Sequence, residues 1–239
     1  MPLEHAVRPN HLRPATELAE RVLVPGDPHR ALAVAQVLLE APKMFNHARG
    51  LWGYTGVARD GEPLTVQSTG LGGPSAAIVC EELIALGARV LVRIGTCGAL
   101  SRDVRLGELL AAERVLALDG ASAALGADEA LEPEPQLLAA LVAAGARPAT
   151  VVSTDLFYDP REGQDSVWVE RGAVAVEMEA ATVLRVAARR GARAACVVAA
   201  TSVPGQDGRR ERIAADQLEQ VALRLGEAGY ASLTTPTTP

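Results

Sequence analysis

The stretch VLVRIGTCGAL, residues 90–100, predicts the central strand of the fold. Its aliphatic run is typical of a strand that is buried on both faces. Arg93 interrupts the run, and a buried cation is costly unless an anion meets it. The small residues 95–98 predict a turn at the carboxyl end of the strand, where glycines let backbone N–H groups approach an anion. Taken alone, the stretch favours a core strand whose arginine pairs with a carboxylate such as Glu82 or Glu179.

The composition argues against some classes of partner. The chain has 239 residues, of which 49% are hydrophobic and 22% are charged, as is ordinary for a globular protein. The formal net charge of −6 argues against a general binder of nucleic acid or of an acidic membrane surface. Any anion site must therefore be a local group of arginines in an acidic background.

The cysteines and the first residues of the sequence bear on where in the cell we expect the protein. Cys80, Cys97 and Cys196 form no CxxC pair, so the sequence suggests neither a metal site nor a disulfide framework. Reduced, buried thiols are the default, and a nucleophilic Cys97 is the less favoured alternative. Because the chain shows no apolar signal core and no run of transmembrane length, we expect a cytoplasmic protein that binds no membrane.

Strand-like and helix-like segments alternate along the chain. They predict an α/β fold, a single layered domain over residues 1–233 with a central mixed β-sheet flanked by helices, followed by a disordered tail, 234–239. Asp60-Gly61 predicts an early antiparallel hairpin. Three stretches are expected to be loops: 119–136 (exposed), 154–165 and 202–212. The expected strands are 21–25, 63–70, 90–94, 109–118, 149–153, 173–179 and 193–201, and the expected helices are 31–40, 76–86, 137–144, 180–190 and 213–228.

The segment VLVPGDPHRA, residues 22–31, predicts a strand, a tight turn and a helix start. This order places backbone N–H groups and Arg30 at a helix N-terminus, which favours a phosphate group. The alternative is a plain Asp-Pro helix start with Arg30 on the solvent face.

Six segments in this order and spacing resemble the nucleoside phosphorylase family, which includes the bacterial purine nucleoside and uridine phosphorylases. No single segment decides the resemblance, but all six occur in register up to about residue 201. They are VLVPGDPHRA (22–31), RGLWGYTG (49–56), TGLGGPSAAIVCEEL (69–83), VRIGTCGAL (92–100), STDLFY (153–158) and AVEMEAA (175–181).

The resemblance implies phosphorolysis, in which phosphate attacks C1′ of a nucleoside and releases the free base and ribose 1-phosphate. Inorganic phosphate is then the co-substrate, with neither metal nor organic cofactor. Several guanidinium groups around one dianion supply charge-assisted hydrogen bonds, and the counter-charge of Arg93 would be this substrate. The phosphate-binding residues implied are Gly26, Arg30, Arg93 and Thr96, with Arg49 contributed by a neighbouring subunit.

The resemblance also implies a nucleoside site. Glu179 would accept hydrogen bonds from the ribose hydroxyls, although an exposed patch at a strand end is the alternative for the EME run. Across a subunit boundary His5 would cap the 5′-hydroxyl, which makes the protein a homo-oligomer, by resemblance a hexamer of three dimers. The other residues implied are Met178 on the ribose, Phe157, Val176 and Glu177 around the base, and Tyr158 at the subunit boundary.

The sequence departs from the family pattern at the base. Ser202 stands where the purine enzymes carry the aspartate that acts as general acid, and a serine hydroxyl is a poor proton source. Asp207, in the following loop, is the alternative candidate for that acid. Arg161 and Gly163 stand where uridine phosphorylases carry glutamine and arginine. We therefore expect a purine-leaning nucleoside phosphorylase with Arg93, Glu179 and Ser202 as catalytic positions. The alternatives are a uridine phosphorylase, a nucleoside hydrolase and a nucleoside-binding protein with weakened catalysis.

Overall fold

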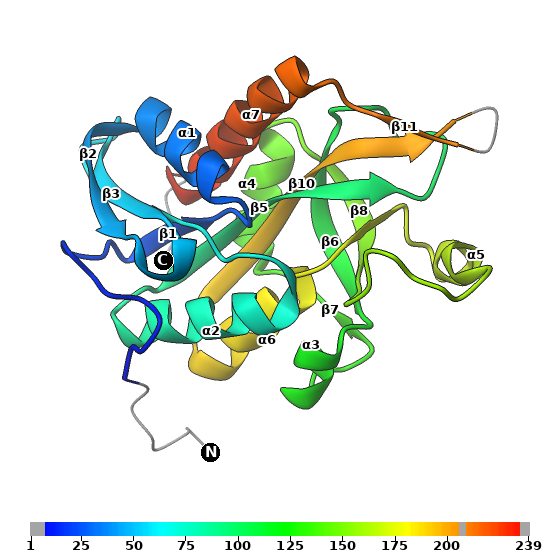
Figure 1. The fold of residues 1–239 in the computed structure, drawn as a ribbon, viewed down its shortest axis with the longest axis horizontal. Coiled ribbons are helices and arrows are strands. Elements are labelled where there is room, and N and C mark those ends of the chain that lie inside the picture. Colours follow the sequence, from blue (N-terminus) through cyan, green and yellow to red (C-terminus); the bar gives the residue numbers. More distant parts are fainter. Residues whose placement is uncertain (1–7, 206–208, 235–239) are drawn as a thin grey trace.

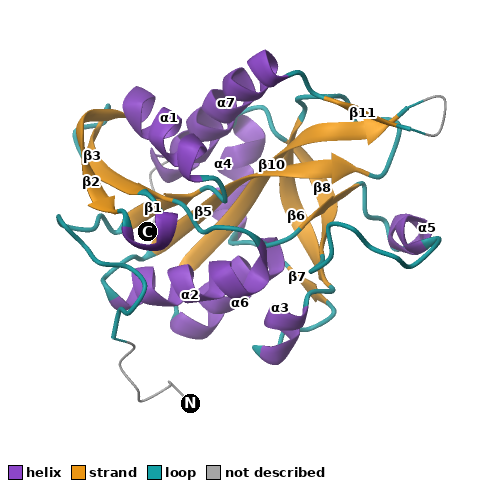
Figure 2. Ribbon diagram, viewed as in Figure 1, coloured by secondary structure: helices purple, strands orange, loops and turns teal. Residues whose placement is uncertain are grey.

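The computed structural model describes residues 8–205 and 209–234. The described chain forms one mixed β-sheet with helices on both faces (Figures 1 and 2). The strands are β1 (Arg21–Val24), β2 (Leu39–Asn46), β3 (Gly53–Ala58), β4 (Pro63–Gln67), β5 (Val90–Ala99), β6 (Leu109–Ala117), β7 (Ala130–Leu131), β8 (Arg147–Ser153), β9 (Ala175–Glu177), β10 (Arg193–Pro204) and β11 (Arg210–Arg212). The helices are α1 (Pro28–Leu38), α2 (Gly72–Ala85), α3 (Gly120–Ala124), α4 (Pro135–Ala143), α5 (Gln164–Glu170), α6 (Ala180–Arg190) and α7 (Ala215–Thr234), with a short 3-10 turn, η1 (Ala48–Gly50).

Strand β5 is the centre of the sheet. It pairs with β1 and β10 in parallel and with β9 in antiparallel orientation. Because β10 also pairs with β6, and β6 leads through β8 to β9, these five strands close into a ring. Strands β4, β3 and β2 extend the other side of the sheet, with the antiparallel hairpin at Asp60-Gly61 as expected.

The helices form two layers, each over its own apolar core. In Figure 1, α1, α4 and α7 cover one face of the sheet, and α2, α3 and α6 cover the other. The face under α1 and α7 buries aliphatic residues such as Leu23, Leu38 and Leu225. The opposite face buries Leu83, Leu91 and Val183 among others. The predicted α/β class with a mixed sheet is therefore confirmed.

The structure corrects the predicted ends of several elements. Strand β5 continues through residues 95–98, where a turn was expected, because β10 and β9 pair with it along this stretch. Residues 202–204 and 210–212, expected in a loop, form an antiparallel pair between β10 and β11. Helix α7 includes Thr234, where the tail was expected to begin, and residues 235–239 lie outside the described residues.

The segment 119–136 was expected to be an exposed loop, and that expectation is wrong. It contains α3, β7 and the start of α4, and it buries Asp119 and Ser122. The Asp119 carboxylate caps α3 by accepting a hydrogen bond from the Ser122 N–H at 2.8 Å, and it accepts another from Thr182 Oγ1 at 2.7 Å. Small polar residues here tie α3 to α6 instead of facing water.

None of the described helices combines the length and the apolar character that crossing a membrane requires.

Candidate active site

Arg93 is the buried cation at the centre of the site. It lies midway along β5 and is only 2% exposed. Its Nε donates to Glu177 Oε2 at 2.9 Å, and its Nη2 forms an ion pair with Glu179 Oε2. Gly95, on the same face of the strand, makes room for this side chain, because a Cβ there would lie 2.6 Å from Arg93 Nη2.

The pairing of Arg93 corrects two expectations. Its counter-charges are protein carboxylates and not the substrate alone, and of the two carboxylates considered Glu179 is a partner whereas Glu82 is not. Glu82 instead accepts hydrogen bonds from the backbone N–H groups of residues 10–12 and pairs with His11. It thereby fastens the N-terminal segment to α2.

Glu177 is fully occupied inside the protein. Besides Arg93, its carboxylate accepts a hydrogen bond from Ser153 Oγ. It also accepts one from the backbone N–H of Glu179 and one from that of Ala180, both at 2.9 Å. Those N–H groups belong to the start of α6, where an anion is favoured. Its side chain is 0% exposed, so Glu177 holds Arg93 and the α6 start and presents no carboxylate to an open pocket.

Arg93 keeps one donor free. Among the described residues, its buried Nη1 has no hydrogen-bond partner. Burial alone would lower the pKa of Arg93, but the negative charges of Glu179 and Glu177 outweigh it and raise that pKa above its ordinary value. A guanidinium that is permanently charged and has a dry, unused N–H is ready to bind an anion.

Arg30 is the second cation of the site. It lies in the first turn of α1 and donates from Nη1 to the Ile94 carbonyl at 3.4 Å. Burial lowers the pKa of Arg30, and the nearby positive charge of Arg93 lowers it further. The negative charges of Asp27 and Glu179 act in the opposite direction without cancelling the decrease. The two guanidiniums and Glu179 therefore share one electrostatic neighbourhood, and two like charges there favour an anion between them.

The turn before Arg30 is hydrogen-bonded to the loop that contains Gly70. Gly70 N–H donates to the Gly26 carbonyl at 3.0 Å, and a Cβ at Gly26 would lie 3.2 Å from Gly70 O. Asp27 then caps α1 by accepting a hydrogen bond from the His29 N–H at 2.7 Å. Gly26 thus stands where N–H groups and the positive end of the α1 dipole favour an anion.

Two further phosphate candidates differ in setting. Thr96 is half-buried on β5, three residues beyond Arg93. Arg49 is exposed in η1 with a φ of 60°, in the left-handed region that non-glycine residues seldom adopt. Within the described chain it has neither a hydrogen-bond nor an ion-pair partner, so the strained turn presents a free guanidinium at the surface.

A second group of candidates lies at the end of β5. Gly98 pairs with Val176 of β9 and with Ser202 of β10. A Cβ at Gly98 would lie 3.3 Å from Ser202 Oγ and 3.5 Å from Val176 Cγ1, so the three residues are in close contact. Arg210 of β11 reaches the same place, with Nη2 2.9 Å from the position of that Cβ.

Sequence reasoning missed Arg210. Its Nε and Nη2 donate to Ser202 Oγ at 3.2 and 3.1 Å, and Nη2 donates to the Ala99 carbonyl at 2.6 Å. In the sequence it is one of three arginines in four residues, 209–212, and only the side-chain hydrogen bonds show that Arg210 contacts Ser202.

The remaining candidates differ in how far the structure describes and buries them. Phe157 and Tyr158 are 65% and 88% exposed and make an edge-to-face pair with ring centroids 5.0 Å apart. Met178 is half-buried between Glu177 and Glu179. Arg161 pairs with Asp159. His5 and Asp207 lie outside the described residues.

Burial raises the pKa of the Cys97 thiol, which disfavours the thiolate that a nucleophile needs.

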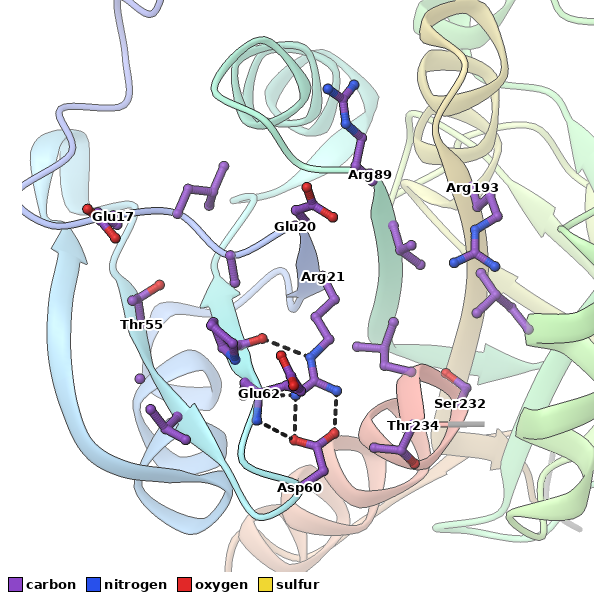
Figure 3. Close-up of a pocket in the computed structure, with 18 of the residues that line it drawn as sticks. Glu17, Glu20, Arg21, Thr55, Asp60, Glu62, Arg89, Arg193, Ser232 and Thr234 are labelled. Carbon is purple, nitrogen blue, oxygen red and sulfur yellow. Dashed lines mark hydrogen bonds and ion pairs between the residues drawn. The ribbon is translucent and has the colours of Figure 1, made fainter. Parts of the chain in front are cut away.

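A large cavity lies elsewhere. It has a volume of about 1370 Å³ and opens at the amino-terminal ends of β1, β5 and β10, beside Arg21, Arg89 and Arg193 (Figure 3). Arg21 forms a two-pronged pair with Asp60 there and lowers the pKa of that carboxyl to about 2. None of the predicted site residues lines this cavity, whose charges are of mixed sign.

Comparison with known proteins identifies the family. A model of the phosphorylase superfamily matches residues 20–230, a range that includes Arg30, Arg93, Glu177 and Glu179. The chain belongs to the phosphorylase superfamily. The predicted membership of the nucleoside phosphorylase family, and with it an enzyme, is confirmed.

Its relatives in this superfamily cover most of the chain. A "purine nucleoside phosphorylase DeoD-type" of Geobacillus kaustophilus is 36% identical over 191 residues, which are 76% of this chain and 80% of the relative. A protein of the same name from Jannaschia sp. is 38% identical over 191 residues, 76% of this chain and 81% of the relative. Another, from Roseobacter denitrificans, is 34% identical over 231 residues, 90% of this chain and 96% of the relative.

Replacement of one carboxylate tests the buried network. We expect Glu177→Gln to lower the free energy of unfolding by about 3–5 kcal/mol, because it leaves Arg93 short of a buried counter-charge. The matched control is Glu170→Gln, on the exposed side of α5, which should change stability by less than about 0.5 kcal/mol. Urea unfolding measures both, and equal effects would show that the Glu177 carboxylate is not required.

Proposed function

We propose that this enzyme is a purine nucleoside phosphorylase. A phosphate oxygen attacks C1′ of the nucleoside, the bond from C1′ to N9 breaks, and the products are the free purine and ribose 1-phosphate. The observation that carries the proposal is the buried, unpaired Nη1 of Arg93 beside Arg30 and Glu179. The names of the relatives support the purine as the base.

The cationic end of the site suits phosphate. Arg93 Nη1, Arg30 and the N–H groups at the Gly26 turn all supply donors, and Thr96 supplies a hydroxyl. Arg93 is already held by two carboxylates, so it needs no rearrangement when the anion arrives. Preorganised donors of this kind stabilise charge in the transition state more than flexible ones.

The carboxylate end suits the sugar. Glu179 Oε1 accepts a hydrogen bond from the Gly72 N–H at 2.5 Å, and Oε2 faces Arg93, which fixes the carboxylate in one orientation. Each oxygen retains a lone pair for a ribose hydroxyl. The negative charge also favours the positive sugar that forms as the base departs, and Met178 would pack against the ring.

Two residues are proposed to act across a subunit interface. Arg49 projects from a strained surface turn, and His5 precedes, in the sequence, residues 10–12, which Glu82 binds to α2. We assign both to the site of a neighbouring copy, which makes the enzyme a homo-oligomer, with three dimers as the arrangement that the family resemblance implies. The only co-substrate is inorganic phosphate; the proposed steps use neither metal nor organic cofactor.

Phosphate dependence and one substitution test this proposal. The purified protein is incubated with inosine, guanosine, adenosine and uridine, with and without phosphate, and free base is followed. We expect purine release only with phosphate, and an increase of roughly ten- to a hundredfold in KM for phosphate in Arg30→Met, which loses a charged hydrogen bond. Among the described residues the Arg30 side chain makes one long hydrogen bond, so its replacement should leave the fold intact.

The matched control is Arg114→Met, an exposed arginine of β6, which should leave KM unchanged. Release that is indifferent to phosphate would identify a hydrolase instead, binding without release would identify a nucleoside-binding protein, and preferred release of uracil would identify a uridine phosphorylase.

Mixing of two impaired variants tests the shared site. We expect Arg49→Met and Arg30→Met each to be impaired, and co-refolded mixtures to recover activity, because about one quarter of sites in randomly mixed dimers would combine an intact Arg30 with an intact Arg49 of the other copy. Activity that only averages the two variants would place Arg49 in its own subunit's site or outside it.

A further inference from the structure

Ser202 and Arg210 form a hydrogen-bonded pair beside Gly98, near the end of β5. Arg210 Nε and Nη2 both donate to Ser202 Oγ, at 3.2 and 3.1 Å. A serine hydroxyl has two lone pairs and one proton. With both lone pairs accepting from the guanidinium, the hydroxyl can act toward a ligand only as a donor.

Arg210 is held in place by the backbone. Its Nη2 donates to the Ala99 carbonyl at 2.6 Å, at the last residue of β5, and contacts the Ser202 carbonyl at 3.3 Å. The guanidinium thus links β5, β10 and β11 at one point. Because Gly98 has no side chain, Arg210 and Ser202 can approach β5 closely beside Val176, on the strand that leads to Glu177, Met178 and Glu179.

The ligand that suits such a pair is a purine with acceptors on adjacent positions. The edge of guanine or hypoxanthine presents N7 and O6, both acceptors, whereas adenine presents the acceptor N7 beside the donor N6 amino group. A contact that can only donate therefore matches a 6-oxopurine and confronts the amino group of adenine without a partner. A hydrogen-bonding site rejects a ligand that leaves a polar group unpaired, because the unpaired group has lost its hydrogen bonds to water and gained none in the site.

The pair also alters how the leaving base is stabilised. A guanidinium is not deprotonated in proteins and a serine hydroxyl is not an acid at neutral pH, so neither delivers a proton to N7. Charge-assisted donors instead stabilise the negative charge that the C1′–N9 electron pair brings onto the purine, and a 6-oxopurine spreads that charge onto O6.

We infer that Arg210 is a specificity-determining residue: through Ser202 it makes the base end of the site donor-only and selects 6-oxopurine nucleosides over adenosine. This inference rests on the proposed function. It concerns the base alone and is independent of how phosphate is bound.

The test compares bases in the full-length protein. In the wild type, kcat/KM for inosine and guanosine should exceed that for adenosine by at least about tenfold. Arg210→Met should reduce this ratio to near unity, as should Ser202→Ala, which keeps Arg210 but removes the hydroxyl. Ser202→Asp should invert or abolish the preference, since a carboxylate accepts from the N6 amino group.

The matched control is Arg212→Met on the same strand. Arg212 pairs through its backbone with Ser202 but, within the part of the chain that the structure describes, its side chain makes no hydrogen bond to it. The Arg212→Met variant should keep the wild-type ratio of kcat/KM for inosine and guanosine to kcat/KM for adenosine. An equal loss in Arg212→Met would mean that net charge and not the hydrogen bond sets the preference, and a wild type that prefers adenosine would overturn the inference.

Binding of free hypoxanthine and adenine, measured by calorimetry, separates the two proposals. If no nucleoside releases its base in phosphate, the proposed function is wrong. The inference is then judged on binding alone: a preference for hypoxanthine that Arg210→Met removes supports it, and equal binding of the two bases contradicts it.

Discussion

The pairing of Arg93 with Glu177 and Glu179 is the interaction on which the rest of the site depends. Three charged side chains lie almost fully buried, and only their mutual contacts make that burial tolerable. Glu177 is satisfied by Arg93, Ser153 and the start of α6, which fixes where α6 begins relative to β5. The free donor on Arg93 and the orientation of Glu179 both follow from this arrangement.

The sheet topology turns that local network into a site with two ends. Parallel pairing of β1, β5 and β10 brings the Arg30 turn next to the strand that carries Arg93. The continuation of β5 and β10 past the core then brings Gly98 together with Ser202 and Arg210. Glu179 lies two residues after β9, and β9 pairs with the end of β5. It therefore lies between the arginines Arg30 and Arg93 at one end of the site and the Ser202–Arg210 pair at the other.

Much of this arrangement was predictable from local sequence, and the rest required the register between strands. An arginine inside an aliphatic run already indicated a buried anion partner, and Glu179 was one of the two carboxylates considered for it. The family resemblance implied a place for Glu177 at the base, and nothing local shows that Ser153 and the α6 N–H groups occupy its carboxylate.

Long-range pairing explains the larger errors. The glycine-rich run after Ile94 has the composition of a turn, yet β9 and β10 hold it extended as part of β5. The charged stretch around Arg210 has the composition of a loop, yet its pairing with residues 202–204 makes it a strand and aims one arginine of three at Ser202. Buried Asp119 had no local signal because its partner Thr182 is far away in sequence.

The central claim is that Arg93 and Arg30 converge on one phosphate ion beside Glu179. A crystal structure of the protein soaked in phosphate tests it most directly. The account requires the anion within hydrogen-bond distance of Arg93 Nη1 and of the Arg30 guanidinium, with the Glu177 and Glu179 contacts unchanged. An anion bound at Arg89 and Arg193 in the large cavity, or a guanidinium of Arg30 turned away to solvent, would contradict it.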